Sequence, residues 1–329
     1  MNKLNILLLA AALLPALSAS EFRAAKPWIE TEKGTYSIDY PGKGWPMLER
    51  TLELKPETFY RVTLEARSKG GTPACNLIFR RGDGVTVFNS IIPTSDWSRQ
   101  TFWLYSRNAK TAKLQCSFDP NGGAGKIAVR SIRTEELSDP ASGNVMPDAD
   151  FEQNTAPLFW RAHRKGTAAP ALAESGDFLT GVRSLQFTSS GNSGIISGKI
   201  PVIPGKTYRL SFWAKASVPA GLTAEFSLWD PAGNHKPQHF HSGAQVKIDS
   251  GWKKYEVSIP IPSDAGTYPD LAERMGSITF GTWNGPEVQF LIDDISFLAP
   301  EFPDRIIAQA SSAHPKESSA SPFPHATHR

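Results

Sequence analysis

Apolar and polar residues alternate along most of the chain between residues 21 and 299. In "YRLSFWAK", Tyr208 and Phe212 fall on one face of a strand, and Arg209 and Trp213 fall on the other. The segments "AEFSLW", "YEVSIPI", "SITFGTW" and "VQFLI" alternate in the same way. Gly, Pro, Asn and Asp separate these short runs, and no stretch has a convincing helical period. The pattern predicts an all-β fold of antiparallel β-sandwiches, with the jelly roll as the expected version.

The strand pattern occurs twice. "LKPETFYRVTLEARSKG" matches "VIPGKTYRLSFWAKASV", which pairs Tyr60 with Tyr208. "SDWSRQTFWLY" matches "SGWKKYEVSIP", which pairs Trp97 with Trp252, and "GKIAVRSIRTE" stands where the second copy has "VQFLIDDISFL". Three matches in the same order and at nearly constant spacing predict a duplicated domain. Each copy has about 120 to 150 residues, which is an ordinary domain size.

These patterns divide the chain into four segments. "MNKLNILLLAAALLPALSAS" has a charged start, a short apolar run and small residues at its end, which predicts a signal peptide over residues 1–20. Two tandem sandwiches follow, over 21–138 and 139–299. Residues 300–329 are rich in Ser, Ala, Pro and His without a period, which predicts a disordered tail. We expect an exported protein, secreted or periplasmic, without a membrane-spanning segment.

Composition and charge narrow the classes of function. Of the 329 residues, 40% are hydrophobic, which is enough for a substantial core, and the 26 Gly and 26 Pro suit a turn-rich β protein. The 35 basic and 32 acidic residues nearly balance at a net charge of +3. A chain without a strong positive field has no footprint for nucleic acid, so no nucleic-acid partner is expected.

The second copy resembles a known family of binding modules. "NVMPDADFEQN", "GVRSLQF", "IPGKTYRLSFWAKA", "GWKKYEVSIPIP" and "VQFLIDDISF" are similar, as an ordered set, to carbohydrate-binding modules of the family 4, 9 and 22 type. These modules are jelly rolls of the galactose-binding-like class. The resemblance covers Asn144 to Leu298 well and Glu21 to Leu137 only in outline. It implies that the partner is a polysaccharide or an oligosaccharide.

The same resemblance implies a structural calcium ion in the second module. In such modules the opening Asp-Phe-Glu and the closing Asp pair commonly help to hold calcium. The candidates here are Glu152, Asp293 and Asp294, and calcium takes six to eight oxygen ligands, at roughly 2.3 to 2.6 Å. The alternative is that one Asp faces solvent while the other accepts hydrogen bonds from backbone amides at a strand bend. The first copy has Arg130 and Ser131 at these positions and should have no such site.

Three tryptophans of the second copy lie off the core phase of their strands. They are Trp213, Trp229 and Trp283. Flat indoles can stack on the C–H faces of sugar rings, and polar groups on the same phase can bond the hydroxyl groups. We therefore expect a carbohydrate-binding platform of these three rings, with three polar partners: Arg209, Glu225 and Gln289. The alternative is that an off-phase tryptophan packs under a loop or at a sheet edge.

Cys75 and Cys116 are the two cysteines, and both fall on the core phase of their strands. In an exported protein such a pair favours a disulfide. Two buried thiols are the alternative. A catalytic role is not expected, because no His or Asn frames either cysteine.

No motif for catalysis is present. The sequence has no Ser-His-Asp arrangement, no phosphate loop and no separate catalytic domain, so we expect a non-catalytic, exported carbohydrate-binding protein. Glycan-degrading enzymes are the expected protein partners. The alternatives are an extracellular adhesion or scaffold protein, an accessory part of a glycoside hydrolase or lyase system, and a lyase or hydrolase on a jelly-roll scaffold. Fold alone does not separate them, since one sandwich supports all of these functions.

Overall fold

The structure is a computed structural model. It describes residues 23–24, 28–40, 42, 44–69, 75–118, 124–137, 139–140, 143–164, 168–173, 177–229 and 240–299. The predicted signal peptide and the predicted tail from residue 300 lie outside these residues. No helix in the described part is long and apolar enough to cross a membrane.

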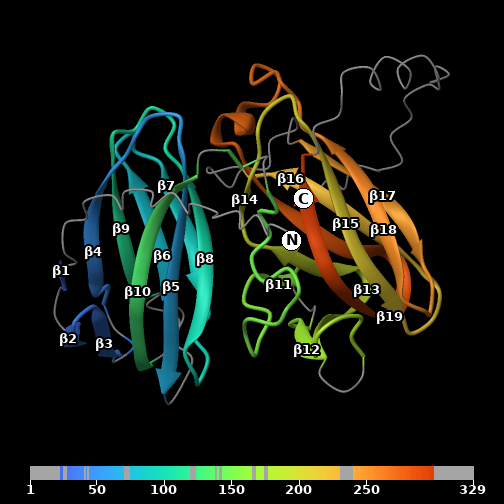
Figure 1. The fold of residues 1–329 in the computed structure, drawn as a ribbon, viewed down its shortest axis with the longest axis horizontal. Helices are drawn as coiled ribbons and strands as arrows, with labels where there is room; N and C mark the ends of the chain where they lie inside the picture. Colours follow the sequence, from blue (N-terminus) through green and yellow to red (C-terminus); the bar gives the residue numbers. More distant parts are fainter. Residues whose placement is uncertain are drawn as a thin grey trace, which may run out of the picture. The chain divides into compact units, whose positions relative to one another are not determined.

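The first half of the chain forms two five-stranded antiparallel sheets (Figure 1). One sheet has the strand order β1-β4-β9-β6-β7 and the other has the order β2-β3-β10-β5-β8. The strands of the first sheet are β1 (Arg23–Ala24), β4 (Met47–Glu53), β9 (Thr111–Phe118), β6 (Cys75–Arg81) and β7 (Thr86–Ile91). Those of the second are β2 (Ile29–Glu32), β3 (Thr35–Tyr40), β10 (Gly125–Leu137), β5 (Phe59–Lys69) and β8 (Ser98–Tyr105).

The second half forms one hydrogen-bonded network of nine strands. They are β11 (Trp160–His163), β12 (Ala171–Ala173), β13 (Ser184–Ser197), β14 (Ile200–Pro201), β15 (Thr207–Ala216), β16 (Ala220–Leu228), β17 (His241–Ile248), β18 (Lys253–Pro260) and β19 (Met275–Leu298). A short 3-10 helix, η1 (Pro269–Glu273), precedes β19. The predicted all-β fold of tandem antiparallel sandwiches is confirmed.

Strand β19 serves both layers of the second sandwich. Its first part, residues 276–281, pairs with β16, and its last part, residues 290–298, pairs with β15. Strand β13 follows it on both sides of a register shift near Gly191. One face therefore consists of β11, β13, β19, β16 and β17, and the other consists of β12, β13, β19, β15 and β18.

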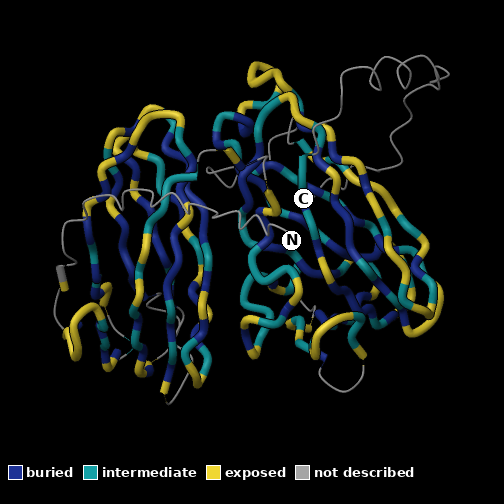
Figure 2. The backbone as a smooth tube through the Cα atoms, viewed as in Figure 1, coloured by how far each residue is buried: buried dark blue, intermediate teal, exposed yellow. Residues whose placement is uncertain are grey.

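Each sandwich has its own hydrophobic core, which Figure 2 shows as the dark, buried strands. The predicted boundary near residue 138 falls between the last strand of the first sandwich and the first strand of the second. Three aromatic residues of the first sandwich, Phe59, Trp103 and Tyr105, nevertheless pack in the core cluster of the second. Both sandwiches belong to one compact unit that ends at Ala299.

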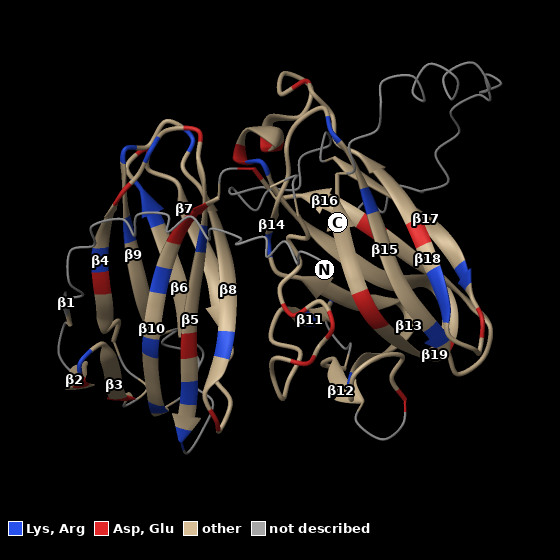
Figure 3. Cartoon of the chain, viewed as in Figure 1, with Lys and Arg blue, Asp and Glu red and all other residues tan. Residues whose placement is uncertain are grey.

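A buried ion network joins the two sandwiches. The Arg81 guanidinium donates to the Glu273 carboxylate at 2.7 Å, and both side chains are at most 4% exposed. Arg107 donates to the same carboxylate at 3.2 Å. Elsewhere basic and acidic residues are interspersed along the strands (Figure 3). Because a buried charge needs a partner, Glu273 ties the helix η1 to the first sandwich.

Candidate functional site

One outer face of the second sandwich is lined by small and polar residues. The intervening residues Ile195, Ala224 and Phe280 are buried in the core, so the pleat points their neighbours outward. The strand register places one such row across β11, β13, β19, β16 and β17: His163, Gly194, Gly281, Thr223 and Gln245. We call this surface the open face.

Two glycines leave the middle of the open face without side chains. Gly194 pairs with Gly281 across β13 and β19. A Cβ atom at Gly194 would collide with the backbone of Phe280, and one at Gly281 would collide with the carbonyl oxygen of Ser193. The close approach of the two backbones therefore requires glycine at both positions. The row therefore has no side chain between His163 and Thr223, and we call this gap the trough.

Trp283 and Glu225 lie together at this trough. Both line a small recess of about 10 Å³, together with His163 and Arg164. The indole of Trp283 is 38% exposed, and the Arg164 guanidinium lies 4.4 Å from its ring centroid. Glu225 Oε1 lies 3.5 Å from His241 Nδ1, which belongs to the neighbouring strand. Burial and the charges of Arg164 and Arg161 lower the pKa of His163, so this imidazole is neutral near pH 7.

The other predicted polar residues lie on the opposite layer. Arg209 and Trp213 belong to β15, where Trp213 pairs with Lys254 on one side and Asp293 on the other. Gln289 belongs to the part of β19 that pairs with β13 opposite Thr188. These three side chains point outward from the layer that contains β15 and β18. They are separated from the open face by the thickness of the sandwich.

Trp229 lies in a third place, between the two sandwiches. It packs against both hydrophobic clusters and lines a cleft that the sandwiches share. The Lys199 amine lies 5.0 Å from its ring centroid. The three predicted indoles therefore do not form one platform, and that expectation is wrong. The physical reason is that alternation distinguishes in from out but not which of the two outer faces a residue reaches.

Sequence reasoning missed three residues of the open face: His163, Thr223 and Gln245. They are polar residues, and no local sequence pattern distinguishes them from other surface residues. The strand pairing alone brings them into one row. The available signal was the alternation of "LTAEFS", which places Thr223 on the same phase as Glu225.

The closing acid pair separates into a buried and an exposed carboxylate. Asp293 is fully buried, and its Oδ2 accepts N–H groups from Leu179 at 3.1 Å and Thr180 at 3.2 Å. Its Oδ1 accepts the Asp294 amide at 2.8 Å. Burial raises the pKa of Asp293, and these amide bonds partly oppose that rise. Asp294 is exposed and has a left-handed φ of 49°.

Glu152 contacts the same segment as Asp293. Its Oε1 accepts the amides of Val182 at 2.8 Å and Arg183 at 2.9 Å. The segment passes so close at Gly181, which has φ of 65°, that a Cβ atom there would collide with the Glu152 carboxylate. The two carboxylates thus fix the loop before β13 to the first and last segments of the domain.

The predicted calcium ligands are not arranged as one cluster. Within the described ranges, no group of three or more His, Cys, Asp or Glu side chains is placed to hold a metal ion. Backbone amides donate to Glu152 Oε1 and to both oxygens of Asp293. Calcium would need further oxygen ligands beside these carboxylates, and calcium binding stays a prediction.

Cys75 and Cys116 are free, buried thiols, so the expected disulfide is wrong. They lie on the neighbouring strands β6 and β9, where Cys75 pairs with Phe118 and Cys116 pairs with Leu77. The two cysteines are thus diagonal neighbours rather than a directly opposed pair. Burial raises the pKa of the Cys116 thiol to about 12, so it is protonated and unreactive.

Comparison with known proteins agrees with the resemblance seen in the second copy. Residues 143–268 match the CBM_4_9 family model, which describes a carbohydrate binding domain. Among curated proteins, none matches the chain. The matched segment contains β11, β13, Thr223 and Glu225, whereas Trp283 lies beyond it.

Several solved structures are similar. The tandem CBM22-1-CBM22-2 domain from Paenibacillus barcinonensis Xyn10C is 14% identical, covers 87% of this chain and 98% of its own, and has a TM-score of 0.38. The C-terminal family 22 carbohydrate binding module of Clostridium thermocellum Xyn10B is 18% identical, covers 49% and 99%, and has a TM-score of 0.37. TmCBM61 in complex with β-1,4-galactotriose is 18% identical, covers 48% and 100%, and has a TM-score of 0.32.

Proposed function

We propose that this chain binds a polysaccharide or oligosaccharide on the open face of its second sandwich. The observation that carries this proposal is the joint position of Trp283 and Glu225 at the glycine-floored trough, within or next to the segment matched by a carbohydrate binding domain. The indole offers an apolar surface for a sugar ring, and the carboxylate accepts hydroxyl protons. His163 and Gln245 lie in the row beside them and supply further hydrogen-bonding groups.

We propose further that the open face binds without catalysing hydrolysis. A glycosidase places two carboxyl groups about 5 to 9.5 Å apart around the bond that it cleaves. In the part of the chain that the structure describes, Glu225 is the one carboxylate that lines the recess. The amino-acid pattern of residues 1–20 supports export of the protein. Association with glycan-degrading enzymes stays a prediction.

Affinity gel electrophoresis with soluble glycans tests this site. The Trp283→Ala variant removes the exposed indole of the open face, and we expect it to lose most of its retardation, at least tenfold in Kd. The matched control is Trp213→Ala, because that indole lies on the other layer and its loss should leave retardation unchanged. Equal loss in both variants, or retention by Trp283→Ala, would contradict the open-face site. Release of reducing ends from the retarding glycan would contradict the absence of catalysis.

A further inference from the structure

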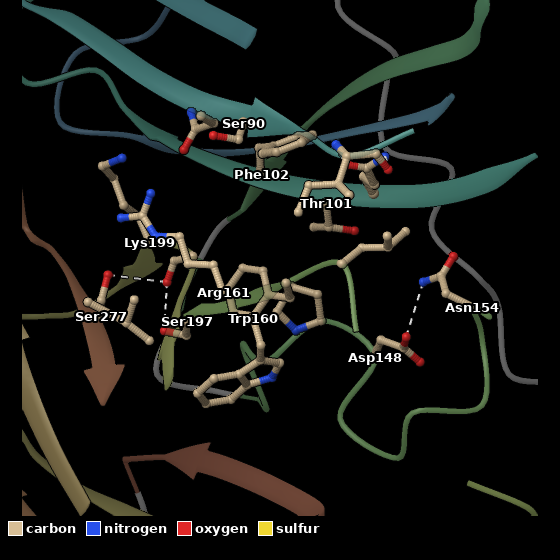
Figure 4. A pocket seen from close by; sticks show the side chains of 18 of the residues that line it. Ser90, Thr101, Phe102, Asp148, Asn154, Trp160, Arg161, Ser197, Lys199 and Ser277 are labelled. Carbon is tan, nitrogen blue, oxygen red and sulfur yellow. Dashed lines mark hydrogen bonds between the residues drawn. The ribbon is translucent and has the colours of Figure 1, made fainter. Parts of the chain in front are cut away.

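The two sandwiches enclose a second, larger site between them. The cleft has a volume of about 420 Å³, and strands β7 and β8 of the first sandwich form one wall. The other wall consists of β11, the end of β13, the end of β16 and Trp229, which directly follows β16. Figure 4 shows Thr101 on the first wall and Arg161 on the second, extending from opposite sides of the cleft. Volumes of roughly 300 to 1,000 Å³ are typical of small-molecule sites.

The cleft is positively charged. Three cationic side chains line it, Arg99, Arg161 and Lys199, against one carboxylate, Asp148. Neither arginine forms an ion pair with a carboxylate among the residues that the structure describes. Asp148 is already engaged, since Oδ1 accepts the Gln153 amide at 2.9 Å and Oδ2 accepts from Asn154 Nδ2 at 3.1 Å. The uncompensated positive charge favours an anionic ligand.

Lys199 is held at the centre of this charge. Its Nζ donates to the carbonyl oxygen of Phe88 at 2.8 Å, which fixes the amine across the two walls. Burial and the neighbouring Arg161 charge lower its pKa to about 8, so it is mainly protonated at pH 7. An ammonium group has three donors, and one is used by Phe88. The other two donors are available to a ligand.

The first sandwich adds an unsatisfied donor. Asn89 lines the cleft, and its Nδ2 is buried without a hydrogen-bond acceptor in the described part of the molecule. A buried donor without an acceptor costs roughly 1 to 3 kcal/mol, so such groups are rare unless a ligand or solvent completes them. Hydroxyl groups also line the cleft, including Ser90 on β7 and Thr101 on β8. These groups suit a ligand with many hydroxyls.

The walls of the cleft are fixed relative to each other. Glu273 is bonded to Arg81 and Arg107, and Arg274 donates to Glu57 at 2.9 Å across the same interface. The Arg274 guanidinium also lies 4.8 Å from the ring centroid of Tyr105. One of these ion pairs, Arg81–Glu273, is buried, and a site whose walls are already held together needs little reorganisation to bind, which favours affinity.

We propose that this cleft binds an acidic saccharide, a sugar unit that carries a carboxylate group. Arg161 and Lys199 pair with the carboxylate, and Asn89 and the wall hydroxyls bond the sugar hydroxyls. The apolar body of the ring lies against the aromatic side chains of the cleft, among them Trp229 and the exposed Phe88. The proposal rests on the proposed function in taking the ligand to be a saccharide, but it uses a different surface and requires both sandwiches.

Calorimetric titration of the full chain with digalacturonate tests the cleft. We expect binding that weakens as salt is raised, because the contacts are charged. The Arg161→Gln, Lys199→Gln double variant should bind digalacturonate at least tenfold more weakly. Lys206→Gln, a change of an exposed lysine in the turn before β15, should not alter the affinity. Absence of digalacturonate binding by the unaltered chain, or full affinity in the double variant, would overturn the proposal.

Two further experiments distinguish saccharide binding in the cleft from simple anion binding and from binding at the open face. A carboxyl-reduced disaccharide of the same linkage should bind at least tenfold more weakly, and acetate at the same carboxylate concentration should not compete. Equal competition by acetate would overturn the saccharide part and leave only an anion site. Trp283→Ala should keep digalacturonate binding while losing retardation by neutral glycans. An error in the open-face proposal and an error in the cleft proposal therefore give different results. Thermal melting of each variant verifies that it is folded.

Discussion

The two sandwiches share backbone devices but use the side chains at them differently. In the first, the Tyr60 hydroxyl accepts the backbone amide of Lys55 at 2.7 Å. In the second, the Tyr208 hydroxyl accepts the amide of Ile203 at 3.0 Å, across the same five-residue separation. Each tyrosine therefore closes the turn that leads into its own central strand. This match supports the duplication that the sequence predicts.

A second shared device is a cation over a tryptophan. The guanidinium groups of Arg67 and Arg130 lie 4.5 Å and 4.1 Å from the ring centroid of Trp97. In the second sandwich the Lys215 amine lies 5.5 Å from the ring centroid of Trp252. Both tryptophans thus serve the outer surface of a sheet in a structural role. Their recurrence in both copies explains why they are poor markers of a ligand site.

The last strands of the two copies, β10 and β19, differ at one position next to a shared β-bulge. Both copies have a register shift there, with a left-handed residue at Ser131, φ 53°, and at Asp294, φ 49°. Before this residue the first copy has Arg130, which pairs with Glu65 at 2.6 Å on the surface. The second copy has Asp293, which is buried and accepts backbone amides. The bulge is common to both, and the residue before it decides whether a loop is fixed there.

The turn before the central strand differs in the same manner. The second copy has Gly205, φ 76°, where the first has Glu57, φ 54°. A left-handed conformation is costly for glutamate, yet Glu57 bonds Arg274 and the Tyr105 hydroxyl at the interface. The first copy therefore has a strained backbone at Glu57, and this residue bonds the second copy. The comparison teaches that the first sandwich has become a partner of the second rather than an independent equivalent.

The largest effect is expected from breaking the interface network. Glu273→Ala leaves the buried Arg81 with Asp83 as its remaining carboxylate partner, and we expect a loss of about 3 kcal/mol in the free energy of unfolding, the lower end for a broken buried pair. The matched control is Glu136→Ala, which removes the partner of the exposed Lys55 and should cost far less, because solvent screens an exposed pair. Chemical denaturation measures both. Equal costs would show that the two sandwiches do not depend on this contact.

A smaller effect is expected at the bulge of the second copy. Asp293→Asn replaces a buried acceptor of three amides by a group that carries its own donors, and we expect a loss of about 2 kcal/mol. Asp294→Asn is the control, since this side chain is exposed and asparagine tolerates the left-handed conformation. Thermal melting of the pair separates the two carboxylates. Similar melting temperatures for both variants would contradict the structural role of Asp293.

The same variants test the predicted calcium ion. If the second sandwich binds calcium through Asp293, added calcium raises the melting temperature of the unaltered chain and a chelator lowers it. Asp293→Asn should then be insensitive to both. A melting temperature of the unaltered chain that changes with neither calcium nor chelator would contradict the calcium prediction.

The smallest effect is expected at Lys199, the amine shared by the two sandwiches. Its folded pKa is about 8 against an ordinary value of 10.5, so the unfolded chain binds more protons between these values. The free energy of unfolding should therefore rise as the pH increases from about 8 to about 10.5. Lys199→Met should lack this rise and should be more stable at pH 7 by about 1 kcal/mol, because a buried charge is removed. The control Lys206→Met should follow the unaltered chain, and a rise retained in Lys199→Met would contradict this assignment.

The sequence alone determined the strand pattern, the duplication and the class of fold. Alternation with period two reports which residues face a core, and it placed Tyr208, Phe212, Cys75 and Cys116 inside, where the structure has them. It also identified the family to which residues 143–268 are similar.

Tertiary structure alone decided which outward residues meet. Trp283 and Gln289 share the outward phase of one strand, yet β19 passes from one layer to the other between them. The inter-sandwich cleft likewise joins Asn89 to Arg161 and Lys199, which no local pattern connects. A strand's alternation encodes only two directions, whereas a pair of sandwiches has several outer surfaces, so strand pairing and packing between the copies choose the site.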